Sequence, residues 1–309
     1  EFIASKLSTR DIVESAWSFA PVLAVMIWLR NQSNEEIRRL VTHHVLQAPA
    51  LVSSSPQALK LLVTEDHVRR NISQLKHLLY WAPTDPPSAM YLLRRQMMSH
   101  PLVTQYALRT LRMFTPETVI FYLPQLVQCL RYDQTGLVEE YLLDAARRSD
   151  LIAHQIIWNV RTYHEDPSFA TTAERMQKRV VNGFQTEEQK ARYQDEVEFF
   201  DQFTDISARL LKEEPEKRRD KLKEELRKLP PRTSATTYIP FEPDLIVKSV
   251  DTDNPLTLRS AAKVPIMVHF NVMDKEHPSK PTKSHSVIIK AGDDTRQDML
   301  AVQVIGLLK

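Results

Sequence analysis

Glycine is scarce in this chain: only 4 of its 309 residues are glycine, and none occurs before Gly136. β-Sandwiches, dinucleotide-binding folds and flexible linkers all use glycine repeatedly, at turns or where the backbone approaches a ligand closely. We therefore expect a mainly α fold. A hydrophobic content of 42% is sufficient for a substantial core.

Charge, cysteine content and hydropathy limit the possible functions. A formal net charge of +2 is too small to predict nucleic-acid binding, and we expect no nucleic-acid partner. Cys129 is the only cysteine, so no internal disulfide can form, and a reducing, cytoplasmic compartment is expected. The longest apolar run, residues 16–29, is shorter than the roughly 20 residues that cross a bilayer. It predicts a buried helix, and the chain opens without a signal-peptide pattern.

Residues 1–182 are predicted to form an α-solenoid of antiparallel helix pairs, of the armadillo or HEAT type. Apolar residues recur at helical spacing through most of this stretch, and the connections between the expected helices are short. Thr115 and Pro116 mark one helix start, and Pro124 is expected to kink or divide that helix. No strict sequence repeat is visible, so the solenoid is expected to be irregular.

Several side chains of the helical region are predicted to be buried. Leu123, Leu126 and Leu130 share one face at helical spacing. Trp81 and Trp158 are interpreted as core aromatic residues, because isolated tryptophans in helical segments most often pack in the interior.

Residues 183–231 are predicted to form a charged helical linker. The stretch 212–229 alternates opposite charges and carries Leu222, Leu226 and Leu229 as a thin apolar stripe. Such alternation is typical of a solvated helix, and a nuclear signal or a membrane-surface patch is the alternative.

Residues 232–309 are predicted to form strands followed by one helix. The runs 264–272 and 286–290 are short, apolar and bounded by turn-forming residues, as strands are. Asp294 is a candidate N-cap with Gln297 three residues later.

The same final helix is expected to bury one side. Leu300, Val304 and Leu308 recur at helical spacing and are predicted to form its buried stripe.

The order of elements around Lys290 suits a nucleotide site. A strand ending in lysine is followed by Gly-Asp-Asp and by a helix with Asp298 in its first turns. A kinase needs an ammonium held against the ATP phosphates and a carboxylate that holds this lysine. A helix N-terminus also tolerates an anion. On spacing alone, a solvated lysine at a strand end is the more common explanation.

The string SVIIKAGDDTRQDMLAVQVI, residues 286–305, resembles the third strand and C-helix of phosphoinositide kinases. The family pattern is hydrophobic-Lys-x-Gly-Asp-Asp-x-Arg-Gln-Asp-x-x-x-x-Gln, and this chain matches it from Lys290 to Gln303. The motif is shared with the large protein kinases related to the lipid kinases. The resemblance implies that Lys290 contacts the ATP phosphates and that Asp298 is its supporting acid.

A second string, SAAKVPIMVHF, resembles the phosphate-covering loop and second strand of the same family, with matches at Ser260, Ala262, Lys263 and Pro265. The loop is not glycine-rich. The resemblance implies that Ser260, Lys263 and backbone amides contact the phosphates. Without the companion motif, Lys263 would be interpreted as an exposed turn lysine.

The helical region indicates the subfamily. The strings YWAPTDPPSAMYLL, HPLVTQYALRTL, VIFYLPQLVQCLRYD and IAHQIIWNV resemble the accessory helical (PIK) domain of phosphatidylinositol kinases. The last two, with the join to SAAKVP, are most similar to the type III alpha phosphatidylinositol 4-kinases. The resemblance covers about residues 70–309 and implies that residues 232–309 are a partial α+β kinase N-lobe.

The resemblance also implies a reaction and a location. The reaction is transfer of the ATP γ-phosphate, with magnesium, to the inositol 4-hydroxyl of phosphatidylinositol. The location is peripheral at the cytoplasmic face of the plasma membrane, in a multi-subunit complex whose scaffold proteins reach the membrane surface. The family's Asp-Arg-His and Asp-Phe-Gly sequences do not occur in these residues. We therefore expect the magnesium ligands and catalytic residues outside this chain, and no activity from it alone.

Two alternatives remain open. The chain could belong to a helical-repeat scaffold with an inert kinase-like end, or to a phosphatidylinositol 3-kinase. The residues that follow Lys309 in the native protein would discriminate between them. His154 most simply packs on a helix face, and Asp251 with Asp253 is most simply a pair of loop acids.

Overall fold

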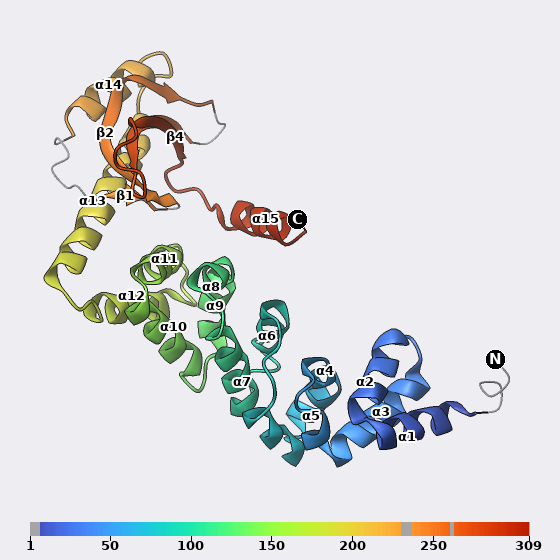
Figure 1. The fold of residues 1–309 in the computed structure, drawn as a ribbon. Helices are drawn as coiled ribbons and strands as arrows, with labels where there is room; N and C mark the ends of the chain where they lie inside the picture. The colour runs from blue at the N-terminus through green and yellow to red at the C-terminus, as the bar shows by residue number, and fades with distance from the viewer. Residues whose placement is uncertain (1–6, 230–236, 241, 260–262, 309) are drawn as a thin grey trace. The chain divides into compact units, whose positions relative to one another are not determined.

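The computed structural model describes residues 7–229, 237–240, 242–259 and 263–308. The chain divides into two compact units, Glu1–Arg179 and Val180–Lys309. The first unit is built of helices, whereas the second combines helices with a sheet (Figure 1). In the part of the chain that the structure describes, no helix is both long and apolar enough to span a membrane.

The helices of the first unit follow one another along a stack (Figure 1). Contacts join α1 to α2, α6 to α7 and α10 to α11, which confirms the predicted solenoid of helix pairs. The elements are α1 (Thr9–Phe19), α2 (Pro21–Arg30), α3 (Glu35–Gln47), η1 (Pro49–Val52), η2 (Pro56–Ala58), α4 (Leu59–Leu62), α5 (Glu65–Arg69), η3 (Ser73–Leu79), α6 (Pro86–Leu92), α7 (Pro101–Leu111), α8 (Pro116–Phe121), α9 (Leu123–Cys129), η4 (Leu130–Tyr132), α10 (Leu137–Arg148), α11 (Asp150–Arg161) and α12 (Ala170–Asn182), which continues into the second unit.

Capping side chains set where several of these helices begin. The Asn34 side chain accepts hydrogen bonds from the backbone N–H groups of Glu36 and Ile37, at 3.0 and 3.1 Å. Asp85 accepts from the backbone N–H of Ser88 at 2.8 Å. Such caps satisfy N–H groups that have no partner within the helix. The starts of these two helices, α3 and α6, therefore follow from local sequence.

Proline divides the helix that begins after Thr115, as predicted. α8 and α9 are separated at Tyr122, and Pro124 lies in the first turn of α9. A proline has no backbone N–H and its ring clashes with the preceding turn, so a continuous helix through this position is disfavoured.

The predicted core of the helical unit is largely confirmed. Leu123, Leu126 and Leu130 are 1%, 0% and 7% exposed. Trp81 is 1% exposed, and its indole N–H donates to the carbonyl of Ser55 at 3.2 Å. Trp158 is only half-buried.

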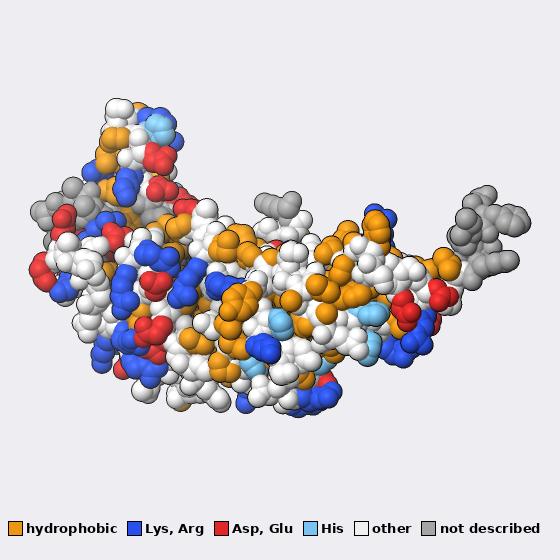
Figure 2. All heavy atoms as spheres, turned by 60° about the horizontal axis from the view of Figure 1, so that its bottom comes forward, with side chains coloured by type: hydrophobic (Ala, Val, Ile, Leu, Met, Phe, Trp, Pro, Cys, Tyr) orange, Lys and Arg blue, Asp and Glu red, His pale blue; other side chains and the backbone are white. Residues whose placement is uncertain are grey.

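The prediction of one buried helix over residues 16–29 is wrong. The run is broken at Ala20, which is extended, and Pro21 begins α2. Phe19 at the end of α1 is 86% exposed. The reason is that proline disfavours helical backbone in the residue before it. Figure 2 shows exposed hydrophobic side chains in several places on the helical unit, among charged ones.

The second unit contains a four-stranded antiparallel sheet with strand order β1-β2-β3-β4. Along β3, Ile266, Val268, Phe270 and Val272 are buried and alternate with more accessible residues, so one face of the sheet is covered. The elements are α13 (Glu187–Leu210), α14 (Arg218–Arg227), β1 (Tyr238–Ile239), β2 (Glu242–Thr257), β3 (Ile266–Asp274), β4 (Lys283–Ile289) and α15 (Arg296–Leu307).

Helices α13 and α14, within the stretch predicted as a linker, pack on this sheet. Phe203, Leu222 and Leu226 belong to the same hydrophobic cluster as Phe270. The rings of Phe203 and Phe270 meet edge to face with centroids 5.3 Å apart. Leu222 and Leu226 of α14 are thus buried, whereas Lys221 and Glu224 of the same helix pair with each other at the surface.

Two expectations for α15 are wrong. Its N-cap is Thr295 rather than Asp294, which lies one residue earlier. The predicted buried stripe is exposed: Leu300, Val304 and Leu308 are 53%, 46% and 83% accessible. Helical spacing shows which residues share a face, but it does not show whether another element covers that face.

Candidate nucleotide-phosphate site

The register of β3 and β4 brings two predicted site residues to one end of the sheet. The strands are antiparallel, and Ile266 pairs with Ile289. Lys263 precedes β3 by three residues, and Lys290 directly follows β4. Because antiparallel neighbours run in opposite directions, the start of one strand meets the end of the other.

Lys263 also reaches the turn that follows β4. Its Nζ atom lies 3.3 Å from the position that a Cβ atom would occupy at Gly292. Gly292 has φ +63°, a left-handed conformation that side chains other than glycine rarely adopt. Glycine therefore supplies both the backbone conformation and the space for the ammonium.

Lys290 is half-exposed and lies near an acid of the same turn. Its Nζ atom is 3.8 Å from Oδ2 of Asp293, and its side chain is 41% accessible. An exposed pair at this distance holds a lysine only weakly. Asp298 lies in the first turn of α15. No ion pair joins it to Lys290 in the described part of the chain, so its role as the supporting acid stays a prediction.

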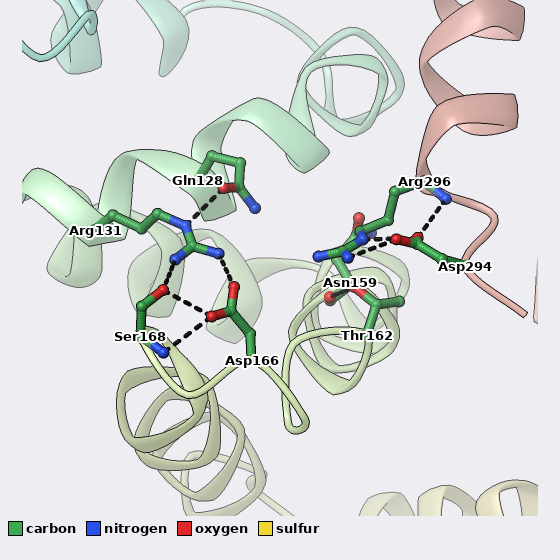
Figure 3. Close-up of polar contacts among 8 residues, drawn as sticks. All are labelled: Gln128, Arg131, Asn159, Thr162, Asp166, Ser168, Asp294 and Arg296. Atoms are coloured by element: carbon green, nitrogen blue, oxygen red, sulfur yellow. Dashed lines mark hydrogen bonds and ion pairs between the residues drawn. The ribbon is translucent and has the colours of Figure 1, made fainter. Parts of the chain in front are cut away.

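Asp294 and Arg296 form a two-bond pair beside this turn. The guanidinium Nε and Nη2 donate to the two carboxylate oxygens at 2.7 and 2.6 Å (Figure 3). The backbone N–H of Arg296 also donates to Asp294 at 3.1 Å. Hydrogen bonds from Arg296 lower the pKa of Asp294 to about 2, so this acid is ionised at neutral pH. Both residues belong to the motif at residues 290–303, but the sequence did not predict that they contact each other.

The backbone that follows Lys263 is held by hydrogen bonds at Val264 and Pro265. The Pro265 carbonyl accepts from the Leu258 N–H at 2.8 Å. The Val264 carbonyl accepts from the hydroxyl of Ser207 on α13 at 2.7 Å. Sequence reasoning missed Ser207, because nothing in the local pattern links it to a residue 57 positions away.

These residues fit a polyphosphate ligand. Two lysine ammoniums and a left-handed turn at Gly292 lie at one end of the sheet, and lysine is a common phosphate ligand. The ion pair with Arg296 reduces the repulsion between the Asp294 carboxylate and a bound anion. Ser260, the fourth predicted site residue, lies outside the described residues. Within the described ranges, no cluster of three or more His, Cys, Asp or Glu side chains is arranged to hold a metal ion.

A separate polar cluster in the helical unit is structural. Arg131 donates to Gln128, Ser168 and Asp166 at 2.8, 2.9 and 2.5 Å (Figure 3). Its guanidinium also lies over the Phe169 ring, 4.2 Å from the centroid. These hydrogen bonds tie the loop before α12 to the end of α9, and each of the three guanidinium nitrogens donates to a protein group.

The remaining candidates have structural roles. His154 is 5% exposed and packs near the Trp158 ring. Asp251 accepts hydrogen bonds from Asn254, and Asp253 pairs with Arg227 at 2.8 Å. Asp251 therefore stabilises the local backbone, and Asp253 stabilises a contact with helix α14.

Cys129 is buried, and its thiol donates to the Leu93 carbonyl at 3.3 Å. Burial raises the pKa of Cys129 to about 12, so the reactive thiolate is scarce.

Comparison with known proteins agrees with this architecture. Residues 29–193 match the accessory domain (PIK domain) of the phosphoinositide 3-kinase family. The chain is 34% identical to phosphatidylinositol 4-kinase alpha 1 of Arabidopsis thaliana, over 97% of the chain and 15% of that protein. It is 33% identical to phosphatidylinositol 4-kinase STT4 of Saccharomyces cerevisiae, over 97% of the chain and 16% of that protein.

A more distant match is phosphatidylinositol 3-kinase C2 domain-containing subunit gamma of Rattus norvegicus, which is 28% identical over 70% of the chain and 15% of that protein. The chain thus spans only about one-sixth of the length of these relatives.

Helix pairs followed by a small antiparallel sheet are the architecture of a PIK accessory domain with the beginning of a kinase N-lobe. The chain belongs to the phosphoinositide 3-/4-kinase family, and its expected resemblance to alpha-type phosphatidylinositol 4-kinases is confirmed.

Proposed function

We propose that this chain is part of a lipid kinase that transfers the ATP γ-phosphate to the inositol 4-hydroxyl of phosphatidylinositol. The observation that carries the proposal is the placement of Lys263 and Lys290 at one end of the β3–β4 pair, next to Gly292. Two cations at this position suit the charge of a nucleotide triphosphate.

The residues of this candidate site would bind and orient the nucleotide. Lys263 and Lys290 would contact the phosphate oxygens, and Ser260 would add a hydroxyl contact. Asp298 would hold Lys290 from the first turn of α15. Magnesium would neutralise phosphate charge, and its ligands would lie outside this chain.

Relatedness favours the 4-hydroxyl over the 3-hydroxyl. The two named 4-kinases are 33% and 34% identical over 97% of the chain. The named 3-kinase is 28% identical over 70% of it. We therefore propose phosphatidylinositol 4-phosphate as the product.

We also propose a domain organisation and a location. The accessory domain covers residues 1–182, the charged helices 183–231, and the partial N-lobe 232–309. The kinase would act as a peripheral protein at the cytoplasmic face of the plasma membrane, within a multi-subunit complex. A solenoid surface with exposed apolar side chains such as Phe19 suits contacts with scaffold proteins.

The test is product analysis with the full-length kinase, phosphatidylinositol vesicles, magnesium and labelled ATP. We expect phosphatidylinositol 4-phosphate from the full-length protein and none from the 309-residue chain alone. A 3-phosphate product would show that the alternative kinase is correct. If the full-length protein forms no phosphorylated lipid, the inert scaffold is the better description.

A further inference from the structure

Ser207 forms a hydrogen bond between helix α13 and the segment that carries Lys263. Its hydroxyl donates to the backbone carbonyl of Val264 at 2.7 Å. Ser207 is only 2% exposed and Val264 only 3%. A buried carbonyl that loses its partner is strongly disfavoured, so this contact favours one backbone position for Val264.

The surroundings of Ser207 make it a rigid anchor. Its helical neighbours Phe203, Ile206 and Leu210 are each at most 1% exposed and lie in the core that covers the sheet. Val264 belongs to the same core. The hydroxyl therefore extends from a well-packed helix face, where side-chain motion is restricted.

Lys263 depends on its backbone for its position. Its ammonium lies beside Gly292 at the end of a long, flexible side chain. The bond from Ser207 holds the next residue, Val264, and the bond from Leu258 holds Pro265. The chain is thus fixed just beyond Lys263, while the lysine side chain reaches the turn after β4.

We propose that Ser207 is a positioning residue for nucleotide binding, which acts by fixing the backbone from which Lys263 reaches the phosphates. This inference rests on the proposed function. It predicts an effect on the nucleotide and not on the lipid, because the hydrogen bond that Ser207 makes in the described part of the chain goes to the segment that carries Lys263.

The experiment compares Ser207→Ala with Ile206→Val in the full-length kinase. Both changes remove atoms from the same buried helix face, but only the first removes the bond to Val264. We expect Ser207→Ala to raise the KM for ATP roughly fivefold, the central value for one lost hydrogen bond, with the KM for phosphatidylinositol unchanged. Ile206→Val should lower the Tm and leave both KM values unchanged.

A double-substitution cycle tests whether Ser207 acts through Lys263. In a Lys263→Ala background, Ser207→Ala should change the KM for ATP by less than about twofold, because coupled residues are not additive. An unchanged KM for ATP in the single variant, or a full additional increase in the double variant, would overturn the proposal. If Ser207→Ala does not fold, Ser207→Cys keeps the size with a weaker donor, and a smaller rise in KM is expected.

Direct nucleotide binding separates this inference from the proposed function. Equilibrium binding of a fluorescent ATP analogue is measured on the same variants without lipid. Weaker binding by Ser207→Ala, absent in Ile206→Val, supports the positioning role even if no lipid is phosphorylated. Equal binding by both variants and the parent protein rejects it.

Discussion

Lys263 and Gly292 meet at the end of the β3–β4 pair, where the lysine Nζ lies 3.3 Å from the place of a glycine Cβ. The two residues come from separate family motifs, one before β3 and one after β4. Antiparallel pairing of Ile266 with Ile289 brings the motifs together. The left-handed backbone at Gly292, with φ +63°, explains why this turn favours glycine, and the end of the Lys263 side chain occupies the space beside it.

Substitution of Gly292 should reduce both stability and nucleotide affinity. Gly292→Ala places a Cβ in the left-handed region, which costs about 1–2 kcal/mol, and against the Lys263 ammonium. We expect a lower Tm and a raised KM for ATP in the full-length kinase.

Gly292→Asn is the matched control, because asparagine tolerates the left-handed conformation better. The asparagine variant should have a higher Tm than the alanine variant, but its KM for ATP should stay as high. An alanine variant with an unchanged Tm and KM would contradict the role given to this turn.

Removal of the Lys290 charge should impair turnover and spare folding. Lys290→Met keeps the length of the side chain, and the side chain is 41% exposed, so a stability change below about 0.5 kcal/mol is expected. Turnover of the full-length enzyme should fall about a hundredfold or more, as for the loss of one preorganised electrostatic contact. The measurements are steady-state kinetics and a thermal melt. Turnover within about threefold of the parent, with an unchanged melt, would refute the role of Lys290.

Leu126 should contribute strongly to the stability of the helical unit. Leu126 lies on the buried face of α9 and is 0% exposed. Leu126→Ala removes buried apolar atoms and leaves a cavity. The free energy of unfolding should therefore fall by about 2–5 kcal/mol. The control is Leu51→Ala, because Leu51 is 56% exposed, and its effect should stay near about 0.5 kcal/mol. The free energy of unfolding of both variants is measured by denaturant titration of the 309-residue chain. Equal losses in the two variants would show that the apolar face is misidentified.

Asp166 should make the helical unit less stable in acid. Hydrogen bonds from Ser168, and then from Arg131, lower the pKa of Asp166 to about 2 (Figure 3). An unfolded aspartate has a pKa of about 3.9. This stabilisation is therefore complete above about pH 5 and is lost as the pH falls through the folded-state pKa.

The measurement is the free energy of unfolding of the chain and of Asp166→Asn between pH 7 and pH 2. The difference between them should be constant above about pH 5 and shrink below it. Ser168→Ala removes one donor and should weaken the same pH dependence. A difference that does not change with pH would show that Asp166 is not stabilised as an anion.

Local sequence was sufficient for the features that depend on neighbouring residues. Scarce glycine and helical periodicity predicted a helical solenoid, and Pro124 predicted the break between α8 and α9. The burial of Leu123, Leu126 and Leu130 followed from their common helix face. The motif from Lys290 to Gln303 predicted the family. Backbone conformation, proline geometry and side-chain spacing all act over a few residues, so the sequence determines them by itself.

Only the tertiary structure decided which elements meet. It places α13 and α14 on the sheet, brings Ser207 to Val264 and Lys263 to Gly292, and leaves Leu300 exposed. The residues of such contacts are far apart in the chain, and their approach depends on strand register and on the packing of a shared core. Periodicity identifies the face of a helix, but the partner that covers it is set by the folded chain as a whole.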